Sequence, residues 1–428
     1  MKSTKTFKAL GVTKPVLDAI RAQKFDKPTE IQARTIPLIL SGRDVIGGSK
    51  TGSGKTLAFS CGIIKKVIPH KGVQAVVLVP TRELAEQVGN AIIKFSKFKR
   101  MSVVKVYGGV SINPQIEHLR RADVVVATPG RLLDHIDRRT VRLNAVKTLV
   151  LDEADLMLDM GFLRDVEKII RETPKRRQTL LFSATVSDDI YHLEKKHMHN
   201  PEKISVEQFV DASKLRQVYI DVLSQEKFSL LVHLLKEERS GLVMVFCNTR
   251  RNTDFVAKNL KANNVQCCAI HGGLTQSKRQ QILQDFHRGK TYALICTDVA
   301  ARGLDIQDVS HIYNYDVCKD AKQYIHRIGR TARAGKEGKA ITLLSDRDHD
   351  NFSKVSRLNR DIEHIEMPEI PSAQIVYRPT GRTPTDRRPG RFMGRRNGSG
   401  GGGRGGQRPR ILRRQSNAAR PRRSNASR

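Results

Sequence analysis

The stretch Asp44–Ile64, "DVIGGSKTGSGKTLAFSCGII", decides the fold of this 428-residue chain. An apolar run at Val45 precedes a Gly-rich loop. The segment Thr56–Ile68 then repeats apolar residues at helical spacing. Glycines let backbone amides turn toward a phosphate at the start of a helix. The order of strand, Gly-rich loop and helix therefore predicts an α/β domain that binds a phosphorylated ligand.

The loop "SKTGSGKT" at residues 49–56 has the chemistry of a phosphate-binding loop. Lys55 can reach the β- and γ-phosphates, and the Thr56 hydroxyl can ligate Mg²⁺. The strict pattern has Gly where Ser49 stands, so a flexible Gly/Ser turn is the alternative, but the strand before and the helix after favour phosphate binding. The residues predicted to hold the nucleotide phosphates are Thr51, Gly52, Ser53, Gly54, Lys55 and Thr56.

A second apolar run, "TLVLDEAD" at 148–155, ends in three acids within four residues. Acids crowded at the tip of a buried strand repel one another, and a divalent cation offsets that repulsion. We predict that Asp152 holds Mg²⁺ through water and that Glu153 orients or deprotonates the water that attacks the γ-phosphate. The alternative is a plain helix N-terminus, where Asp and Glu are favoured. The phosphate loop upstream favours the metal interpretation.

Short β-branched runs alternate with helical stretches along most of the chain. Such continuous apolar strands are buried on both faces, which indicates parallel sheets flanked by helices. Two successive series predict two tandem α/β domains. The predicted strands lie within 44–48, 75–80, 102–109, 123–130, 148–155 and 179–185, and then within 243–249, 267–273, 292–298, 311–316 and 340–344.

The predicted boundaries are a first domain at 1–206, a polar linker at 207–214, a second domain at 215–368 and a tail at 369–428. Polar, Gly- or Thr-bearing signatures follow nearly every strand. Because open parallel sheets bind ligands along the carboxyl edge of their strands, we expect a site assembled between the two domains.

The net charge of +34, with a pI near 10.3, indicates a polyanionic partner. Residues 378–428 carry sixteen Arg and one Asp, a net of +15, which leaves +19 for residues 1–377. This tail has almost nothing apolar to bury, so we expect disorder. No apolar run is long enough to span a membrane, and no secretion signal opens the chain. Six Cys without a CxxC pair fit a reduced, cytoplasmic interior.

The "DEAD" tetrad at 152–155, with the motifs around it, resembles the DEAD-box RNA helicases of helicase superfamily 2. The resemblance covers about residues 7–345 and implies two tandem RecA-like domains. It also implies ATP and Mg²⁺ as cofactors and RNA as the partner. Motifs that carry it include "FDKPTEIQ" (25–32), "PTREL" (80–84), "TPGR" (128–131), "SAT" (183–185), "TDVAARGLD" (297–305) and "HRIGRTARAG" (326–335).

By this resemblance, Gln32 hydrogen-bonds the adenine edge and Phe25 stacks on the base, whereas Asp305 binds the ribose. Arg330 and Arg333 are expected to reach the γ-phosphate as arginine fingers. Together with Arg327 they are spaced three residues apart, which puts them on roughly one helical face.

The same resemblance assigns two further sets of residues. The first is expected to contact the RNA backbone without reading bases, and the second to couple the ATP site to RNA, with Ser183 and Thr185 hydrogen-bonded to Asp155. The RNA-binding set is Arg82, Gly109, Thr128, Arg131, Thr249, Arg250, Gly272, Arg279, Thr297 and Arg302; the coupling set is Asp155, Ser183, Thr185 and His326.

The function that these motifs favour is an RNA-stimulated ATPase that separates short RNA duplexes locally. ATP and RNA together are expected to close the domains and bend the gripped strand. The alternatives are an ATP-switched RNA clamp or annealing chaperone, and a translocating DNA helicase, which the adenine motif disfavours. A monomer is expected, and the basic tail should add salt-sensitive affinity for RNA. Ribosome assembly, RNA decay and cold response are all compatible pathways.

Overall fold

The computed structural model describes residues 6–48, 52–185, 187–206, 214–238, 241–301, 306, 309–319, 321–332, 337–357, 359 and 361–378. Their strands form two seven-stranded sheets with parallel pairing throughout, one in residues 6–206 (the first lobe) and one in residues 214–378 (the second lobe). The prediction of two tandem α/β units with parallel sheets is confirmed. Residues 207–213 of the predicted linker and most of the tail lie outside the described residues.

The first sheet has the strand order β3-β4-β2-β5-β6-β1-β7. Its central strands are apolar and buried, as continuous β-branched runs predict. The edge strand β7 is mostly polar, with every second residue exposed, and was not predicted. The strands are β1 (Val45–Gly48), β2 (Ala75–Leu78), β3 (Val103–Val106), β4 (Val124–Ala127), β5 (Thr148–Leu151), β6 (Gln178–Ser183) and β7 (Glu202–Ser205).

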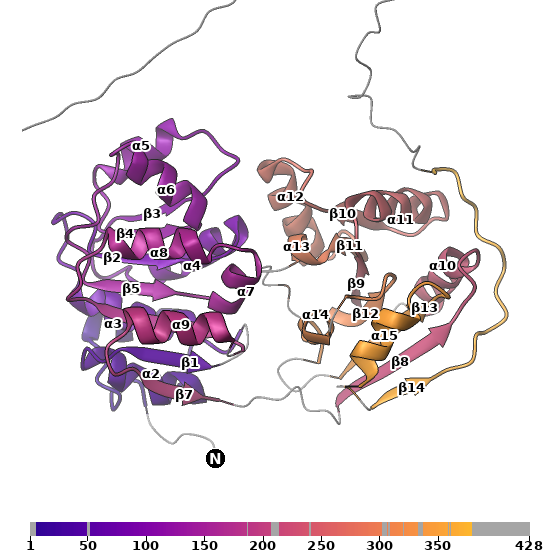
Figure 1. The fold of residues 1–428 in the computed structure, drawn as a ribbon, viewed down its shortest axis with the longest axis horizontal. Helices are drawn as coiled ribbons and strands as arrows, with labels where there is room; N and C mark the ends of the chain where they lie inside the picture. Colours follow the sequence, from indigo (N-terminus) through magenta and orange to yellow (C-terminus); the bar gives the residue numbers. More distant parts are fainter. Residues whose placement is uncertain are drawn as a thin grey trace, which may run out of the picture. The chain divides into compact units, whose positions relative to one another are not determined.

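Helices cover both faces of the first sheet and enclose two apolar cores. On one face lie α1 (Lys14–Ala22), α2 (Glu30–Leu40), α3 (Lys55–Lys66) and α4 (Arg82–Phe95). On the other lie α5 (Asn113–Leu119), α6 (Pro129–Asp137), α7 (Ala154–Asp159), α8 (Leu163–Arg171) and α9 (Asp188–His197). Figure 1 shows α8 and α9 lying across this second face.

The second sheet has the order β10-β11-β9-β12-β13-β8-β14. Its strands are β8 (Leu215–Asp221), β9 (Leu242–Cys247), β10 (Cys267–Ile270), β11 (Ala293–Thr297), β12 (Val309–Asn314), β13 (Gly338–Leu344) and β14 (Ile362–His364). One face packs against α10 (Lys227–Glu237) and α11 (Arg250–Ala262). The other packs against α12 (Gln276–His287), α13 (Asp298–Ala301), α14 (Ala321–Ile328) and α15 (His349–Ser356).

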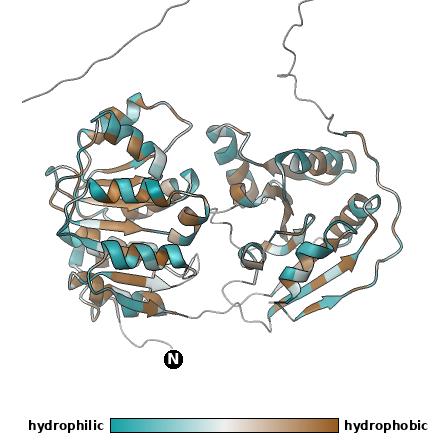
Figure 2. Cartoon of the chain, viewed as in Figure 1, coloured by the Kyte–Doolittle hydropathy of each residue, from teal (hydrophilic) through white to brown (hydrophobic). Residues whose placement is uncertain are grey.

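The hydropathy of each lobe follows this layering, with apolar strands inside and polar outer faces on the helices (Figure 2). All six cysteines are free, and five of them are buried. None of the described helices has the length and apolarity needed to cross a bilayer.

The second lobe extends beyond the predicted boundary at 368. Ile370 and Ala373 pack against the core under α10 and α11. Asn259 on α11 holds the backbone of Val376 and Tyr377 through three hydrogen bonds of 2.8–2.9 Å. Residues 369–378 therefore belong to the second lobe, although the sequence analysis assigned them to the tail. The side-chain amide of Asn259 supplies hydrogen-bond partners for the extended backbone of this segment.

Candidate nucleotide and RNA site

The carboxyl edge of the first sheet brings Lys55 and two of the predicted acids together. Gly54, in the left-handed conformation at φ 94°, ends the loop, and α3 begins at Lys55. Strand β5 ends one residue before Asp152. The Lys55 ammonium lies 3.2 Å from Glu153 Oε1. Lys55, Asp152 and Glu153 are 4%, 3% and 9% exposed, so this charged cluster is shielded from water.

Negative charge exceeds positive charge in this cluster. Burial alone lowers the pKa of Lys55, but the carboxylates of Glu153 and Asp152 raise it above its ordinary value. Burial raises the pKa of Asp152, the Lys55 ammonium opposes that shift, and Glu153 reinforces it. Carboxylate and hydroxyl oxygens are the ligands that Mg²⁺ prefers. Asp152, directly after β5, and Thr56, in the first turn of α3, carry oxygen atoms of this kind, so their chemistry fits ligands of Mg²⁺.

Glu153 adopts a backbone conformation that residues other than Gly rarely use. Its φ is 52°, and it stands at the N-cap of α7 without a side-chain hydrogen bond to that helix. The side chain contacts Lys55 instead. The plain helix-cap interpretation is therefore not what this side chain does, and strain of this kind is concentrated at functional sites.

Asp155 joins the strand end to the "SAT" segment. Its Oδ2 accepts hydrogen bonds from the Ala184 and Thr185 amides at 3.2 and 3.1 Å, and from the Thr185 hydroxyl at 3.0 Å. The contact predicted for Thr185 is present. The Ser183 hydroxyl donates to the Thr185 carbonyl at 2.5 Å rather than to Asp155, because the turn after β6 folds its own backbone over that side chain.

Gln32 has a local structural role next to the phosphate loop. Its Oε1 accepts from the Thr29 amide at 2.9 Å, which completes a capping box at the start of α2. Its Nε2 donates to the Gly54 carbonyl at 3.0 Å. A Cβ added at Gly54 would lie 2.3 Å from that nitrogen, so only glycine fits this contact. Phe25 is 48% exposed, with its ring 6.4 Å from that of Phe95.

The predicted RNA residues of the first lobe gather along the same sheet edge. A Cβ at Gly109 would lie 1.9 Å from Arg82 Nη1, so the guanidinium packs directly on this glycine, whose φ is 79°. Arg131 donates to the Val110 carbonyl at 3.2 Å from both terminal nitrogens. Arg82, Arg131 and Thr128 line a cavity of about 370 Å³.

Two predicted RNA residues of the second lobe, Gly272 and Arg279, line that cavity. Thr249 is the N-cap of α11 and accepts from the Asn252 amide at 3.1 Å. A Cβ at Gly272 would lie 2.9 Å from Arg250 Nη2, which repeats the Arg-on-Gly packing of the first lobe. Arg279 Nε donates to Glu83 at 2.8 Å.

The arginines of "HRIGR" do not share one helical face. Helix α14 ends at Ile328, so Arg330 lies in the turn that follows, where it is 8% exposed. The helical-face prediction is wrong because Gly329 ends the helix between the first two arginines. His326 is half-buried within α14, and Thr297 is buried at the end of β11. Thr51, Arg302, Asp305 and Arg333 lie outside the described residues.

Arg327 is a buried residue whose role the sequence did not reveal. It is 1% exposed, and its five N–H groups donate five hydrogen bonds. Nε and Nη2 bind Asp298 at 2.7 and 2.6 Å. Nη2 also binds Asn248, and Nη1 binds Asn314 and the Asp316 carbonyl. The only feature of the sequence that pointed to Arg327 was its place three residues before Arg330, a predicted arginine finger.

Comparisons with known proteins agree with this geometry. Residues 29–193 match the DEAD/DEAH box helicase family model, and residues 226–335 match the helicase conserved C-terminal domain. The DEAD-box ATP-dependent RNA helicase CshA of Bacillus subtilis is 43% identical over 374 residues, which are 86% of this chain and 76% of that protein. The Geobacillus kaustophilus protein of the same name is 44% identical over 86% of this chain and 80% of its own length.

Among solved structures, Saccharomyces cerevisiae Dbp5 bound to RNA and ADP BeF3 is similar at a TM-score of 0.77 and 34% identity, covering 85% of this chain and 96% of that one. A DEAD box protein from Methanococcus jannaschii has a TM-score of 0.51 and 41% identity, covering 84% of this chain and 99% of that one. The sheets, the motif geometry and these likenesses lead to one conclusion: the chain belongs to the DEAD/DEAH box helicase family.

Proposed function

We propose that this protein is an RNA-stimulated ATPase that uses ATP hydrolysis to separate short RNA duplexes locally. The observation that carries the proposal is the buried cluster of Lys55, Asp152 and Glu153, in which carboxylate charge exceeds ammonium charge. A bound Mg–ATP would complete this cluster, because Mg²⁺ would offset the charge of the acids and Lys55 would contact the phosphates.

Each residue then has a chemical task. Glu153 accepts a proton from, or orients, the water that attacks the γ-phosphate, and its contact with Lys55 keeps it at the phosphate end of the loop. Thr56 and Asp152 would hold Mg²⁺, which would supply Lewis-acid stabilisation of the phosphates. Gln32 selects adenine and Phe25 covers the base. Arg330, Arg333 and Asp305 complete the nucleotide site.

The link to RNA rests on Asp155. Three hydrogen bonds from residues 184–185 tie the acid tetrad to the segment after β6. His326 joins this network. A change at the γ-phosphate can therefore alter the backbone that follows β6, and through it the grip of the RNA-binding set. That set contacts phosphates and sugar hydroxyls, so recognition is independent of base sequence.

We place this activity in the cytoplasm and assign it to a monomer, with the basic tail adding salt-sensitive RNA affinity. Remodelling of ribosomal or RNA-decay complexes is the biological setting that fits such an activity.

A strand-displacement assay tests the proposal. With Mg²⁺ and ATP, the protein should displace a strand from a short RNA duplex but not from a long one, and Glu153→Gln should remove the displacement. The substitution Glu172→Gln, at an exposed site in the same lobe, is the matched control. Slow ATP hydrolysis with annealing but no displacement would favour the alternative function, an RNA clamp.

A further inference from the structure

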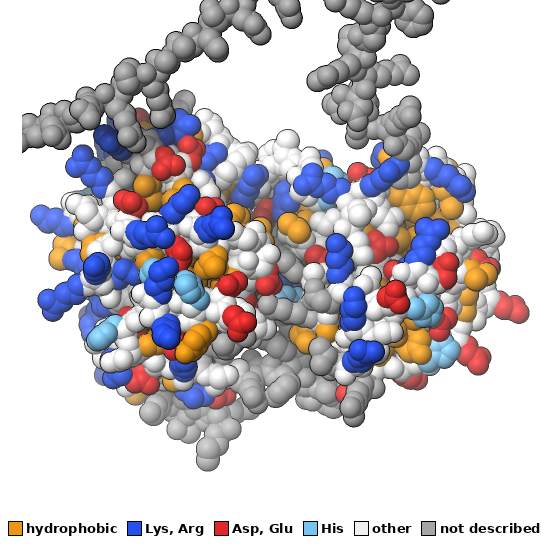
Figure 3. Space-filling view, in the orientation of Figure 1, with side chains coloured by type: hydrophobic (Ala, Val, Ile, Leu, Met, Phe, Trp, Pro, Cys, Tyr) orange, Lys and Arg blue, Asp and Glu red, His pale blue; other side chains and the backbone are white. Residues whose placement is uncertain are grey.

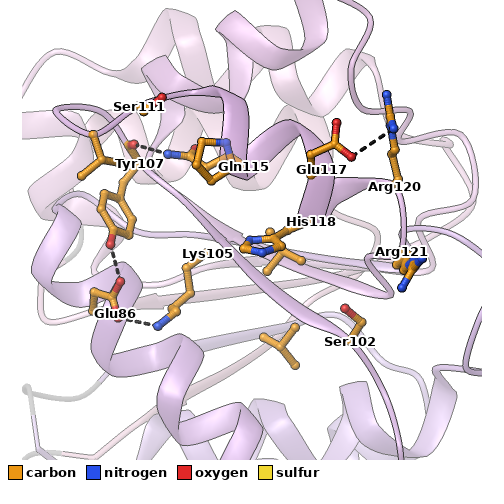
Figure 4. Close-up of a pocket in the computed structure, with 14 residues that line it drawn as sticks. Glu86, Ser102, Lys105, Tyr107, Ser111, Gln115, Glu117, His118, Arg120 and Arg121 are labelled. Carbon is orange, nitrogen blue, oxygen red and sulfur yellow. Dashed lines mark hydrogen bonds and ion pairs between the residues drawn. The ribbon is translucent and has the colours of Figure 1, made fainter.

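A groove runs along the free edge of the first sheet. Its floor is the edge strand β3, which among the described strands pairs with β4 alone. Figure 4 shows α5 on one side of the groove, with Gln115 and His118, and Glu86 of α4 on the other. The groove has a volume of about 860 Å³.

One end of the groove adjoins the proposed RNA-binding loop. Val110 and Ser111 line it and directly follow Gly109. Arg131, a predicted RNA-binding residue, donates to the Val110 carbonyl and so fixes this end against the RNA-binding edge. The groove is therefore continuous with the proposed RNA-binding surface.

The acids inside the groove are already paired. Lys105 Nζ lies 2.5 Å from Glu86 Oε2, and the Tyr107 hydroxyl donates to the other oxygen of Glu86. The Glu117 carboxylate accepts from Arg120 at 3.0 Å. The Arg121 side chain forms no hydrogen bond or ion pair with any residue that the structure describes. Arg121 is therefore a cation available at the far end of the groove, where the nearby Asp123 carboxylate is buried and accepts from the His70 and Ser102 amides.

The surface around that far end is also basic. Residues 94–121 contain seven Lys or Arg and a single acid, Glu117. The Ser102 amide donates to Asp123 at 2.8 Å, which brings the 97–102 turn beside Arg121. Phe98, in this turn, is 50% exposed and has Lys97 5.7 Å from its ring centroid. Figure 3 shows Lys and Arg spread over much of the visible face of the first lobe.

We propose that single-stranded RNA flanking the core site continues along this groove, with Arg120 and Arg121 binding its phosphates. The inference rests on the proposed function, because the strand must already lie against Gly109. Basic side chains with an exposed aromatic ring are how proteins hold single strands without reading sequence. Strand β3, at about 3.3 Å per residue, gives the groove a length of about 13 Å.

RNA is favoured over a protein segment by charge and by continuity. The chain's own Arg-rich tail has the same sign of charge as the far end and is repelled by it. An acidic peptide would match the charge, but it would have no reason to begin at the RNA-binding loop. An RNA strand meets both conditions.

The test compares short and long RNA on the full chain. Single strands of about 6 and about 16 nucleotides separate core binding from flank binding. We expect Arg120→Ala/Arg121→Ala to weaken binding of the long strand about three- to tenfold near 0.15 M salt and to lower its salt slope by about 1.4, since two phosphate contacts are lost. Stimulation of ATP hydrolysis by the short strand should not change, which also shows that the variant is folded.

The controls separate charge from shape. Arg120→Lys/Arg121→Lys should keep wild-type affinity, because a phosphate contact needs only the positive charge. The variant Lys168→Ala/Lys195→Ala, at exposed sites on α8 and α9, should bind both the short and the long strand as the wild type does. If the alanine variant binds the long strand as tightly as the wild type does, the inference is wrong. The groove would then be free for a protein occupant instead. If the short strand fails to stimulate the wild-type ATPase, the proposed function fails instead.

Discussion

Two buried charged clusters lie at the carboxyl edges of the two sheets, and they are balanced in opposite ways. In the first lobe, the acids at 152–155 face one ammonium, and both the Asp152 and the Lys55 pKa are raised. In the second lobe, Arg327 has an acceptor for each of its five N–H groups. Among the described residues, carboxylates outnumber ammonium groups in the first cluster, whereas every N–H donor of Arg327 in the second has an acceptor.

This difference distinguishes a cluster that can bind a ligand from a cluster that stabilises the structure. A cluster with an excess of carboxylates gains from a bound cation, which is the part that the proposed function gives to the Mg²⁺ of the nucleotide. A fully bonded arginine gains nothing from a ligand. Instead, Arg327 ties together residues that follow β9 (Asn248), β11 (Asp298) and β12 (Asp316), next to predicted RNA contacts at Thr249 and Thr297.

The largest effect is expected where the charge is unbalanced. Replacing Glu153 with Gln keeps the shape but removes the proton acceptor, so ATP hydrolysis should fall about 10²- to 10⁴-fold. Steady-state phosphate release measures this. Glu172→Gln should hydrolyse ATP as the wild type does. An equal rate for Glu153→Gln would remove Glu153 from the chemistry.

The second prediction concerns the balanced cluster. Arg327→Met leaves the Asp298 carboxylate without its partner, so the second lobe should lose about 3–5 kcal/mol of unfolding free energy. Urea unfolding followed by circular dichroism reports it. Arg357→Met, at an exposed site, should stay within about 0.5 kcal/mol of the wild type. If Arg327→Met is no less stable than that control, the interpretation that this cluster stabilises the structure is wrong.

The third prediction concerns a mutation that should stabilise the protein, whereas most mutations destabilise it. Burial raises the pKa of Asp152 to about 6, so at pH 7 its ionised form opposes folding. The amide in Asp152→Asn should raise the unfolding free energy by about 1 kcal/mol in EDTA and weaken Mg–ATP binding. Below the ordinary Asp pKa the carboxyl is neutral in both states, so the gain should vanish as pH falls from about 6 to about 4. A loss of stability at pH 7 would contradict this balance.

The smallest effect is expected at a third cluster, where one acid, Glu167, faces Lys196 and two histidines. The pKa of Glu167 is lowered to about 2 by side-chain hydrogen bonds, of which the bond from Lys196 contributes most and those from His192 and His197 contribute less. This stabilisation is present above the ordinary Glu pKa and is lost as pH falls toward 2. Glu167→Gln should lower the melting temperature by about 2–4 °C at pH 7. The difference from wild type should shrink below pH 4, and a constant difference would assign the effect to packing.

The features that could be predicted from the sequence are those that follow a regular residue pattern. Buried strands such as β5 and β6 were located closely because their apolar runs are continuous, whereas the polar edge strands β7 and β14 were missed. The Thr185 contact followed from the motif. The bond from Ser183 to the Thr185 carbonyl depends on the conformation of the turn after β6, which the motif does not specify. The complete bonding of Arg327 depends on how turns far apart in the sequence meet, which no local pattern records.

The stimulation of ATP hydrolysis by RNA tests the account most directly. The measurement is the ratio of hydrolysis rates with and without saturating single-stranded RNA, for wild type and for Thr185→Val, which loses the hydroxyl bond to Asp155. We predict a ratio well above one for the wild type and a much smaller one for the variant. A wild-type ratio of one would contradict the link between the acid cluster and RNA.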